Sequence, residues 1–501
     1  MSKIVRLALA TALLGALGTA HAEEVKLTGY LLGAPPAGMP DVVAALNQKL
    51  QPELGVTVEI DHIGWSELNS KYPLVLAAGE GIDWIYSADW CQYSPQAARG
   101  AFKELTLEMI QKYMPRHYAA TPKQAWNQVK VNGKMFMIPT STPDRKVPVM
   151  LVRADLVKKY GLKPVTKVSE LEPYLAAVKK NDPAMIPMNL DNGYDLAQPF
   201  GALVNEISPP NTPIQISNNA SGSPFYAQYE DPKRAVNSVV EEPYATAFKK
   251  AASIMKGWYD KGYVNKNPFA NTVLSRDSFA QGKSAVAFAN SQNVQETLAK
   301  AAQAGFDVAI VPMLSRTGTY PADPFTNNGV AVAASSKNVE KTLQLLDLIM
   351  EEPAYDYLVY FGLEGKNWQA TADGKVGLPP GVTPEKNTYP PDAAGFWFTN
   401  KDIFKPLSTW SADYVALRGK VKGMLFNSTF TGYAFAADPV KTEVANLTAV
   451  WAQYANPLYV GAVPSVDAAF QTLSKQLKAA RLDKVHAEIK KQVAAFGAGQ
   501  G

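Results

Sequence analysis

The sequence has a single cysteine, Cys91, among its 501 residues. No intramolecular disulfide can form, and a chain of this length can bury a core large enough to be stable without one. Histidine is scarce as well, with four residues and no HExxH or similar spacing, which disfavours a zinc site built from histidines. The G-x-S-x-G motif of serine hydrolases is also absent. These absences give no support to the common hydrolase classes.

Long hydrophobic runs are missing too. The apolar stretch at residues 7–17 is shorter than the roughly 18 residues that a membrane-spanning helix needs. It follows Lys3 and Arg6 and precedes the small-x-small site Ala20-His21-Ala22, which is typical of a secretory signal peptide. We therefore expect residues 1–22 to be removed on export. A lipoprotein would have a cysteine just after the apolar stretch, and none stands there, so we expect a periplasmic protein without a lipid anchor.

Neither sign of charge dominates the chain. It has 49 Lys and Arg against 45 Asp and Glu, so there is no electrostatic argument for a nucleic acid or an anionic membrane as partner. What the chain does have is aromatic residues, with nine Trp and 23 Tyr, and a length that predicts two or three domains. The aromatic content suggests an aromatic surface in addition to the core.

The first part of the chain after residue 22 alternates strand and helix patterns. Runs of β-branched and apolar residues predict strands, and apolar residues at helical spacing predict the helices between them. Repeated strand–helix–strand order predicts a mostly parallel sheet with helices on both faces. The predicted strands are residues 25–32, 56–64 and 82–86, and the predicted helices are residues 40–50 and 65–78.

The same alternation restarts after residue 146. Beyond residue 365 the composition changes to a stretch dense in Gly and Pro, followed by three amphipathic helices, of which the last is predicted over residues 466–496. The predicted strands of this part are residues 147–152, 184–190, 284–289, 306–312 and 329–335, with a long helix over 243–262.

Four stretches resemble segments of the extracellular solute-binding proteins of ABC importers, in particular the large LipO-type members with an extra C-terminal domain. One of them has the family's F-x-x-G-K-x-A-M pattern, with Val286 in the place of the Met. Their order along the chain is that of the family. The stretches are KYPLVLAAGEGIDWIYSADW (71–90), VNGKMFMIPT (131–140), FAQGKSAVAFANSQN (279–293) and the segment from Ser335 to Trp368.

The resemblance implies an α/β chain with the two-lobed periplasmic-binding-protein (type II) fold and a helical C-terminal extension. The ligand of such proteins lies in the cleft between the lobes. By this resemblance the N-terminal lobe takes residues 23–143 plus 278–325, and the C-terminal lobe takes residues 144–277 plus 326–365. Residues 366–501 would form the extension, packed on the second lobe.

Aromatic and polar side chains follow several predicted strands at their carboxyl ends, the edge where open α/β sheets bind ligands. Asp89 and Trp90 follow the third strand, and Trp65 follows the second. Asn290 and Gln292 follow a later strand, although Asn and Gln are also common turn residues. A sugar stacks its apolar C–H face on an indole and pairs its hydroxyls with such polar groups. We therefore expect a carbohydrate-binding cleft.

Other residues can reach the cleft from elsewhere. Arg145 lies at the expected crossover and offers a charge-assisted donor, unless it pairs with a carboxylate of a lobe. Asn327 and Trp397 can approach from the second lobe. Trp84 and Trp258, in contrast, fit core positions. The expected ligand-binding residues are Trp65, Asp89, Trp90, Arg145, Asn290, Gln292, Asn327 and Trp397.

The function expected from these features is the capture of a carbohydrate, favoured to be an oligosaccharide, for delivery to the membrane permease of an ABC importer. Two alternatives remain open: a binder of a peptide or an organic anion, and an exported glycoside hydrolase with two flanking carboxylates. We expect no catalytic residue, no cofactor and no metal site. The expected partners are the small-molecule ligand and the permease subunits, without nucleic acid, and the protein is expected to be a monomer.

Overall fold

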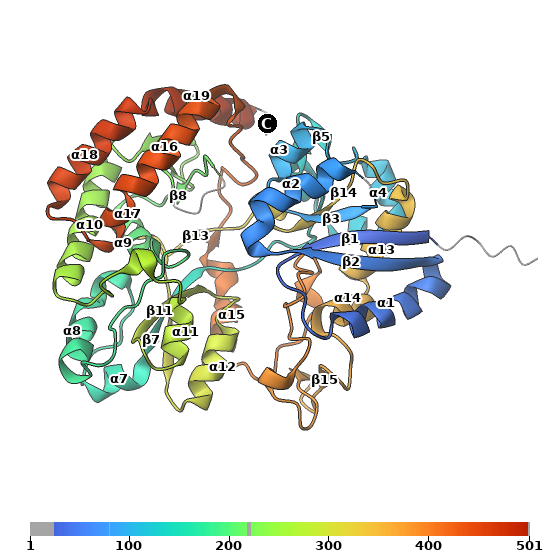
Figure 1. The fold of residues 1–501 in the computed structure, drawn as a ribbon, viewed down its shortest axis with the longest axis horizontal. Coiled ribbons are helices and arrows are strands. Elements are labelled where there is room, and N and C mark those ends of the chain that lie inside the picture. Colours follow the sequence, from blue (N-terminus) through green and yellow to red (C-terminus); the bar gives the residue numbers. More distant parts are fainter. Residues whose placement is uncertain (1–24, 80, 218–221, 499–501) are drawn as a thin grey trace, which may run out of the picture.

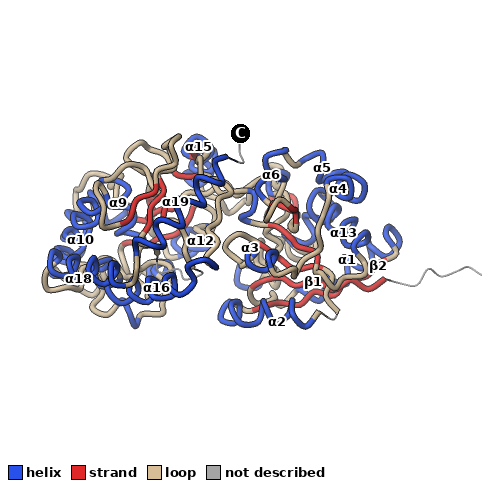
Figure 2. The backbone as a smooth tube through the Cα atoms, turned by 90° about the horizontal axis from the view of Figure 1, so that it is seen from above, coloured by secondary structure: helices blue, strands red, loops and turns tan. Residues whose placement is uncertain are grey.

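The computed structural model describes residues 25–79, 81–217 and 222–498. The predicted signal peptide, residues 1–22, lies outside this part of the chain. Two lobes lie side by side, each with its own sheet and its own large buried core (Figure 1, Figure 2). This arrangement confirms the predicted two-lobed α/β fold.

The sheet of the first lobe has five strands in the order β2-β1-β3-β14-β6. Strands β1, β2 and β3 are parallel, as the sequence pattern predicts, whereas β14 runs antiparallel between β3 and β6. The strands are β1 (Val25–Leu32), β2 (Val56–Ile63), β3 (Trp84–Ser87), β6 (Ile138–Pro139) and β14 (Gly329–Val332).

Helix α1 (Met39–Leu54) illustrates how the local sequence forms these elements. Pro40 fits the first helical turn, where a missing N–H breaks no hydrogen bond. The buried face has apolar residues three and four positions apart, and Gly55 ends the helix with a left-handed φ of 66°. The other helices and short hairpins of this lobe are α2 (Leu68–Ala78), α3 (Tyr93–Ala98), α4 (Leu107–Tyr113), α5 (Pro115–Ala120), α6 (Lys123–Gln128), β4 (Lys130–Val131), β5 (Lys134–Met135), α13 (Val339–Glu351), α14 (Pro353–Phe361), β15 (Gln369–Ala370) and β16 (Val376–Gly377).

The second lobe contains a three-stranded antiparallel sheet with β7 at its centre, between β11 and β12. The predicted strand over 184–190 is reduced to isolated bridges at Ile186 and Met188, which pair with Ser284 and Val264. The elements are β7 (Pro148–Arg153), α7 (Ala154–Lys159), α8 (Glu172–Asn181), α9 (Gln198–Ile207), β8 (Thr212–Pro213), β9 (Phe225–Ala227), β10 (Val236–Ser238), α10 (Tyr244–Asp260), α11 (Ser275–Ala280), β11 (Val286–Asn290), α12 (Gln295–Gln303) and β12 (Val308–Pro312).

The expected assignment of two segments to the lobes is wrong. Residues 278–325 were expected in the first lobe, but β11 and β12 pair with β7 in the second. Residues 326–365 were expected in the second lobe, but β14 pairs with β3 in the first. The reason is physical: a buried strand's apolar pattern does not encode which distant strand it pairs with.

The expected extension is also divided between the lobes. Tyr389, Phe396 and Phe398 lie in the core of the first lobe, so the stretch rich in Gly and Pro belongs there. The helices from Ala412 onward pack on the second lobe, as predicted for the extension. These helices are α15 (Ala412–Met424), α16 (Lys441–Tyr454), α17 (Asn456–Val460), α18 (Val466–Ala479) and α19 (Leu482–Ala498).

The predicted single helix over residues 466–496 is two helices, α18 and α19. Arg481 lies between them with a left-handed φ of 64°, which a continuous right-handed helix cannot contain. Helix α18 packs against α10 and α16, and α19 packs against α16 and β10, at the outer side of the second lobe (Figure 1).

Three segments connect the lobes, and we call them the hinge segments: residues 140–147, 313–328 and 399–411. The second contains β13 (Tyr320–Pro321), which pairs with β17 (Leu425–Phe426). Among the described residues, no helix combines the length and apolarity that crossing a membrane requires.

Candidate functional site

Four aromatic side chains gather at the carboxyl edge of the first-lobe sheet, the edge that faces the second lobe (Figure 1). They are Trp65, Tyr86, Trp90 and Trp397, and we call them the aromatic platform. The rings of Trp65 and Trp397 stack at 15° with centroids 5.5 Å apart, and the centroids of Trp65 and Trp90 are 6.3 Å apart. Tyr86 is fully buried beneath them, whereas Trp65 is 56% exposed and Trp90 is 41% exposed.

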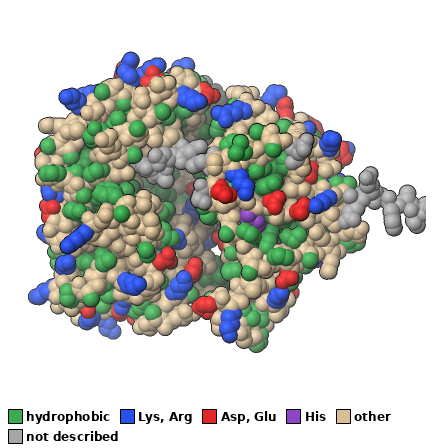
Figure 3. Space-filling model, viewed as in Figure 1, with side chains coloured by type: hydrophobic (Ala, Val, Ile, Leu, Met, Phe, Trp, Pro, Cys, Tyr) green, Lys and Arg blue, Asp and Glu red, His purple; other side chains and the backbone are tan. Residues whose placement is uncertain are grey.

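The molecular surface is hollowed between the two lobes (Figure 3), and the platform lies at the edge of the first-lobe sheet that faces the second lobe. Exposed indoles that contact one another leave a continuous apolar surface in contact with water. Such a surface is unfavourable in solution and is typical of a site that stacks a ligand.

A glycine makes room for Trp65. The short helix η1 (Trp65–Glu67) follows β2 directly and places the indole over Gly33, which follows β1. A Cβ at Gly33 would stand 3.2 Å from Trp65 Nε1, and Gly33 has a φ of +95°, which side chains rarely tolerate. The ends of two neighbouring strands thus determine the position of this ring.

Trp397 comes from a loop far along the chain that is held against the same sheet edge. His62 Nε2 lies 3.0 Å from the carbonyl oxygen of Ala394 and donates to it. Burial lowers the pKa of His62, so the ring is neutral in this contact. A Cβ at Gly395 would stand 2.9 Å from the carbonyl oxygen of Leu32, so only glycine allows this close approach.

Hydrogen bonds connect the platform to the hinge segments. Trp90 Nε1 donates to the carbonyl of Asn327 at 2.8 Å, and Tyr86 Oη donates to Asn328 Oδ1 at 2.6 Å. Asn328 Nδ2 in turn donates to Asp144 Oδ2 at 3.1 Å. Asn327 therefore reaches the site from the first-lobe side, not from the second lobe as expected.

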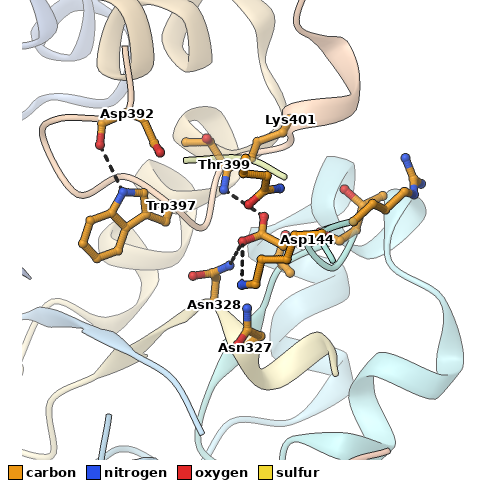
Figure 4. A network of polar contacts seen from close by, with 12 residues as sticks. Asp144, Asn327, Asn328, Asp392, Trp397, Thr399 and Lys401 are labelled. Carbon is orange, nitrogen blue, oxygen red and sulfur yellow. Dashed lines mark hydrogen bonds and ion pairs between the residues drawn. The ribbon is translucent and has the colours of Figure 1, made fainter. Parts of the chain in front are cut away.

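An ion-pair network occupies the hinge (Figure 4). Lys401 Nζ lies 2.9 Å from Asp144 Oδ1, and Lys146 Nζ lies 3.2 Å from Asp323 Oδ2 and 3.5 Å from Asp144 Oδ2. Burial opposes the ionisation of Asp144, but Lys401 and Lys146 outweigh it and hold its pKa well below the ordinary value. The network ties all three hinge segments together.

Two further carboxylates flank the platform, Asp89 and Asp392. The backbone N–H of Trp90 donates to Asp89 Oδ1 at 2.8 Å, and Trp397 Nε1 donates to the carbonyl oxygen of Asp392 at 3.0 Å (Figure 4). Solvent reaches both residues. The surrounding protein nevertheless removes part of their hydration, which raises the pKa of each to about 6.

Three other expected site residues are not part of the aromatic platform. Arg145 donates from Nη1 and Nη2 to the two carboxylate oxygens of Asp402 at 2.6 and 2.9 Å, so it pairs with a carboxylate, here one of the third hinge segment. Asn290 caps a turn, because its Oδ1 accepts the backbone N–H groups of Gln292 and Asn293. Asn290 and Gln292 also belong to the second lobe and not to the first. Trp84 and Trp258 are fully buried, as predicted.

Sequence reasoning missed several residues of the site. All four residues of β3 are buried, so nothing in the strand pattern distinguishes Tyr86 from its neighbours. Asp144, Lys146 and Lys401 come together only through the hinge. Asp392 could have been noticed, because it lies in the aromatic stretch YPPDAAGFWF. On the second lobe, Tyr194 is 40% exposed and lies within electrostatic range of Lys146, which places it near the hinge.

Comparison with known proteins establishes the family. Residues 42–361 match the family model described as bacterial extracellular solute-binding protein, and the chain belongs to this family. Residues 429–498 match a domain of unknown function, DUF3502. The resemblance identified from the sequence is thereby confirmed.

Two relatives match in sequence. A carbohydrate ABC transporter substrate-binding protein of Streptococcus pneumoniae is 24% identical over 476 residues, covering 93% of this chain and 90% of the relative. Lipoprotein LipO of Bacillus subtilis is 24% identical over 335 residues, covering 64% of this chain and 63% of its own length.

Solved structures agree with the fold. The N-glycan transport solute binding protein NgtS from Streptococcus pneumoniae superposes with a TM-score of 0.78 at 22% identity, covering 95% of this chain and all of that one. The alginate-binding protein AlgQ2, without calcium ion, has a TM-score of 0.66 at 18% identity, covering 94% and 98%. Similarity at this level supports the two-lobed architecture.

Proposed function

We propose that this protein is the substrate-binding component of an ABC import system that captures an oligosaccharide between its two lobes. The observation that supports the proposal is the aromatic platform, whose exposed indoles of Trp65 and Trp90 contact each other at the sheet edge that faces the second lobe. A sugar ring stacks its C–H face on such a ring, and its hydroxyls find acceptors in Asp89 and Asp392 beside the platform.

The family and the relatives support this proposal. The chain belongs to the extracellular solute-binding proteins, and the Streptococcus pneumoniae relative is named as a carbohydrate ABC transporter substrate-binding protein. In this proposal the protein acts in the periplasm as a monomer. Its lobes close around the sugar, and the closed form is presented to the permease subunits.

The energetic requirement is modest. A periplasmic binder with a Kd of about 1 μM needs roughly 8 kcal/mol of binding free energy. A few stacked rings and several buried hydrogen bonds supply this amount when the groups are held in place before binding. Here Gly33, His62 and Gly395 hold the platform in position.

Isothermal titration of the mature protein with a panel of oligosaccharides tests the proposal, with peptides and organic anions as competing ligand classes. We expect micromolar or tighter binding of at least one oligosaccharide. We also expect that Trp65→Ala weakens this binding at least about fivefold, the loss of one stacking contact. Tyr118→Ala is the matched control, since Tyr118 is an exposed aromatic on the outer helix α5. Binding only to peptides or anions would refute the proposal.

The proposal also states that the ligand is released unaltered. Asp89 and Asp392 are two carboxylates beside one site, which is the residue pair that a glycoside hydrolase would need. Incubation with the bound oligosaccharide, followed by measurement of new reducing ends, tests this point. We expect none, and turnover that is lost in Asp89→Asn would establish the enzyme alternative.

A further inference from the structure

The charge arrangement around the aromatic platform has a consequence for the ligand. Three cations within the hinge segments are each already in an ion pair. Lys401 pairs with Asp144, Lys146 with Asp323, and Arg145 with Asp402 through two parallel hydrogen bonds. An acidic ligand would have to break one of these ion pairs in order to bind one of these three cations. The aspartate that loses its cation would then remain partly buried without a counter-ion, which is unfavourable.

The two carboxylates that flank the platform differ from the hinge carboxylates in the charges around them. Within the described parts of the chain, neither Asp89 nor Asp392 has a cation at ion-pair distance. Solvent reaches both residues. The carboxylate of Asp89 accepts the backbone N–H of Trp90, and the backbone carbonyl of Asp392 accepts the indole N–H of Trp397, so each residue adjoins a tryptophan of the platform. Asp89 accepts the Trp90 N–H and Asp392 interacts with the Tyr360 hydroxyl, but a carboxylate accepts several hydrogen bonds, so each retains acceptor capacity for a molecule that lies on the rings.

A carboxylate accepts hydrogen bonds and cannot donate them when it is ionised. Sugar hydroxyls are suitable donors to it. The carboxylate of a uronic or sialic acid is not a donor. Its negative charge would face the negative charge of Asp89 or Asp392 in a cleft where water is partly excluded, which is unfavourable. The fold itself does not decide this question, since its structural relatives include both an N-glycan transport protein and an alginate-binding protein, and alginate is acidic.

We infer that the cleft selects uncharged oligosaccharides and rejects acidic ones, and that Asp89 and Asp392 are the residues that determine this selectivity. The inference rests on the proposed carbohydrate-binding function and adds the charge class of the ligand. The aromatic platform supplies stacking for any sugar, and the two carboxylates discriminate between sugars by charge.

The experiment compares pairs of oligosaccharides with the same linkage and length that differ only in charge. β-1,4-linked mannose and mannuronate oligomers form one pair, and sialylated N-glycans whose sialic acid carboxyl is amidated or free form another. Isothermal titration of the full mature chain should give a Kd for the uncharged member that is at least about tenfold lower, which corresponds to one or two unfavourable charge contacts. Equal or tighter binding of the acidic member overturns the inference while carbohydrate binding stands. Binding of no oligosaccharide overturns the proposed function itself.

Variants test the residues. The double variant Asp89→Asn with Asp392→Asn keeps the shape of both side chains and removes their charge. It should therefore reduce the difference in Kd between the acidic and the uncharged oligosaccharide of a pair about tenfold. The control variant Glu108→Gln with Glu340→Gln removes two exposed charges on the outer helices α4 and α13 and should leave the difference unchanged. If the control narrows the difference as much as the cleft variant does, net charge and not these two residues is responsible, and the assignment is wrong.

Discussion

The replacement of Gly33 by alanine adds a single Cβ atom and tests whether this glycine determines the position of Trp65 in the aromatic platform. The added Cβ would stand 3.2 Å from Trp65 Nε1, closer than ordinary van der Waals contact, at a residue with a φ of +95°. Two separate effects are expected. The backbone strain costs about 1–2 kcal/mol of folding free energy. The contact pushes the indole, which is half exposed and free to move, away from its stack with Trp397.

The chain offers a control that separates the two effects. Gly55 also has a positive φ, of +66°, but a Cβ there meets nothing within 4 Å. Gly55→Ala should therefore lose about 1–2 kcal/mol of stability in urea denaturation and bind the oligosaccharide like the wild type. Gly33→Ala should lose a similar amount and also bind about fivefold more weakly, which corresponds to about 1 kcal/mol of lost stacking.

The assay is isothermal titration with the oligosaccharide found in the panel, combined with urea denaturation monitored by circular dichroism. Wild-type affinity in Gly33→Ala, together with the expected loss of stability, would show that the position of Trp65 does not matter to the ligand. The assignment of the platform as the ligand surface would then be wrong.

The other predictions concern the platform, the hinge and pH. Trp90→Ala should weaken binding by about 1–3 kcal/mol in titration and leave the melting temperature nearly unchanged; a large loss of stability with unaltered affinity would place Trp90 in the core. Asp144→Asn should lower the free energy of unfolding by about 3 kcal/mol, because it leaves Lys401 and Lys146 without their shared carboxylate, and a variant as stable as the wild type would contradict the importance of the network. The depressed pKa of Asp144 means that its contribution is present above the ordinary pKa of an aspartate and is lost as the pH falls below it. The pKa of Asp89 near 6 predicts that affinity for an uncharged oligosaccharide falls as the pH drops through about 6, because the protonated carboxyl accepts hydrogen bonds less well; affinity that does not change between pH 7.5 and 5 would separate Asp89 from the ligand.

Sequence reasoning predicted the elements whose pattern is local. Strand β1 was predicted with its observed bounds and β2 with one residue too many at its end, whereas α1, predicted over 40–50, extends to Leu54. The break at Arg481 could not be predicted, since the surrounding residues are good helix formers and only the observed φ reveals the turn.

Some of the expected site residues also follow from local sequence patterns, and others depend on long-range pairing. Trp65 and Trp90 follow parallel strands of one sheet, so their meeting at the carboxyl edge is a consequence of topology. Trp397 and Asn327 were expected to approach from the second lobe, but both lie on the first-lobe side, because the long-range pairings that place them, such as β14 with β3, leave no local pattern in the sequence. Asn290 shows that residue type alone does not identify a ligand-binding residue, because an amide side chain after a strand caps a turn as readily as it binds a ligand.

Small-angle X-ray scattering of the mature protein, with and without the oligosaccharide it binds, tests the central claim most directly. The account predicts that the radius of gyration falls on saturation, as the lobes close around the sugar, and that mass spectrometry afterwards recovers the sugar intact. An unchanged radius of gyration at saturation, or recovery of shortened sugar, would contradict it.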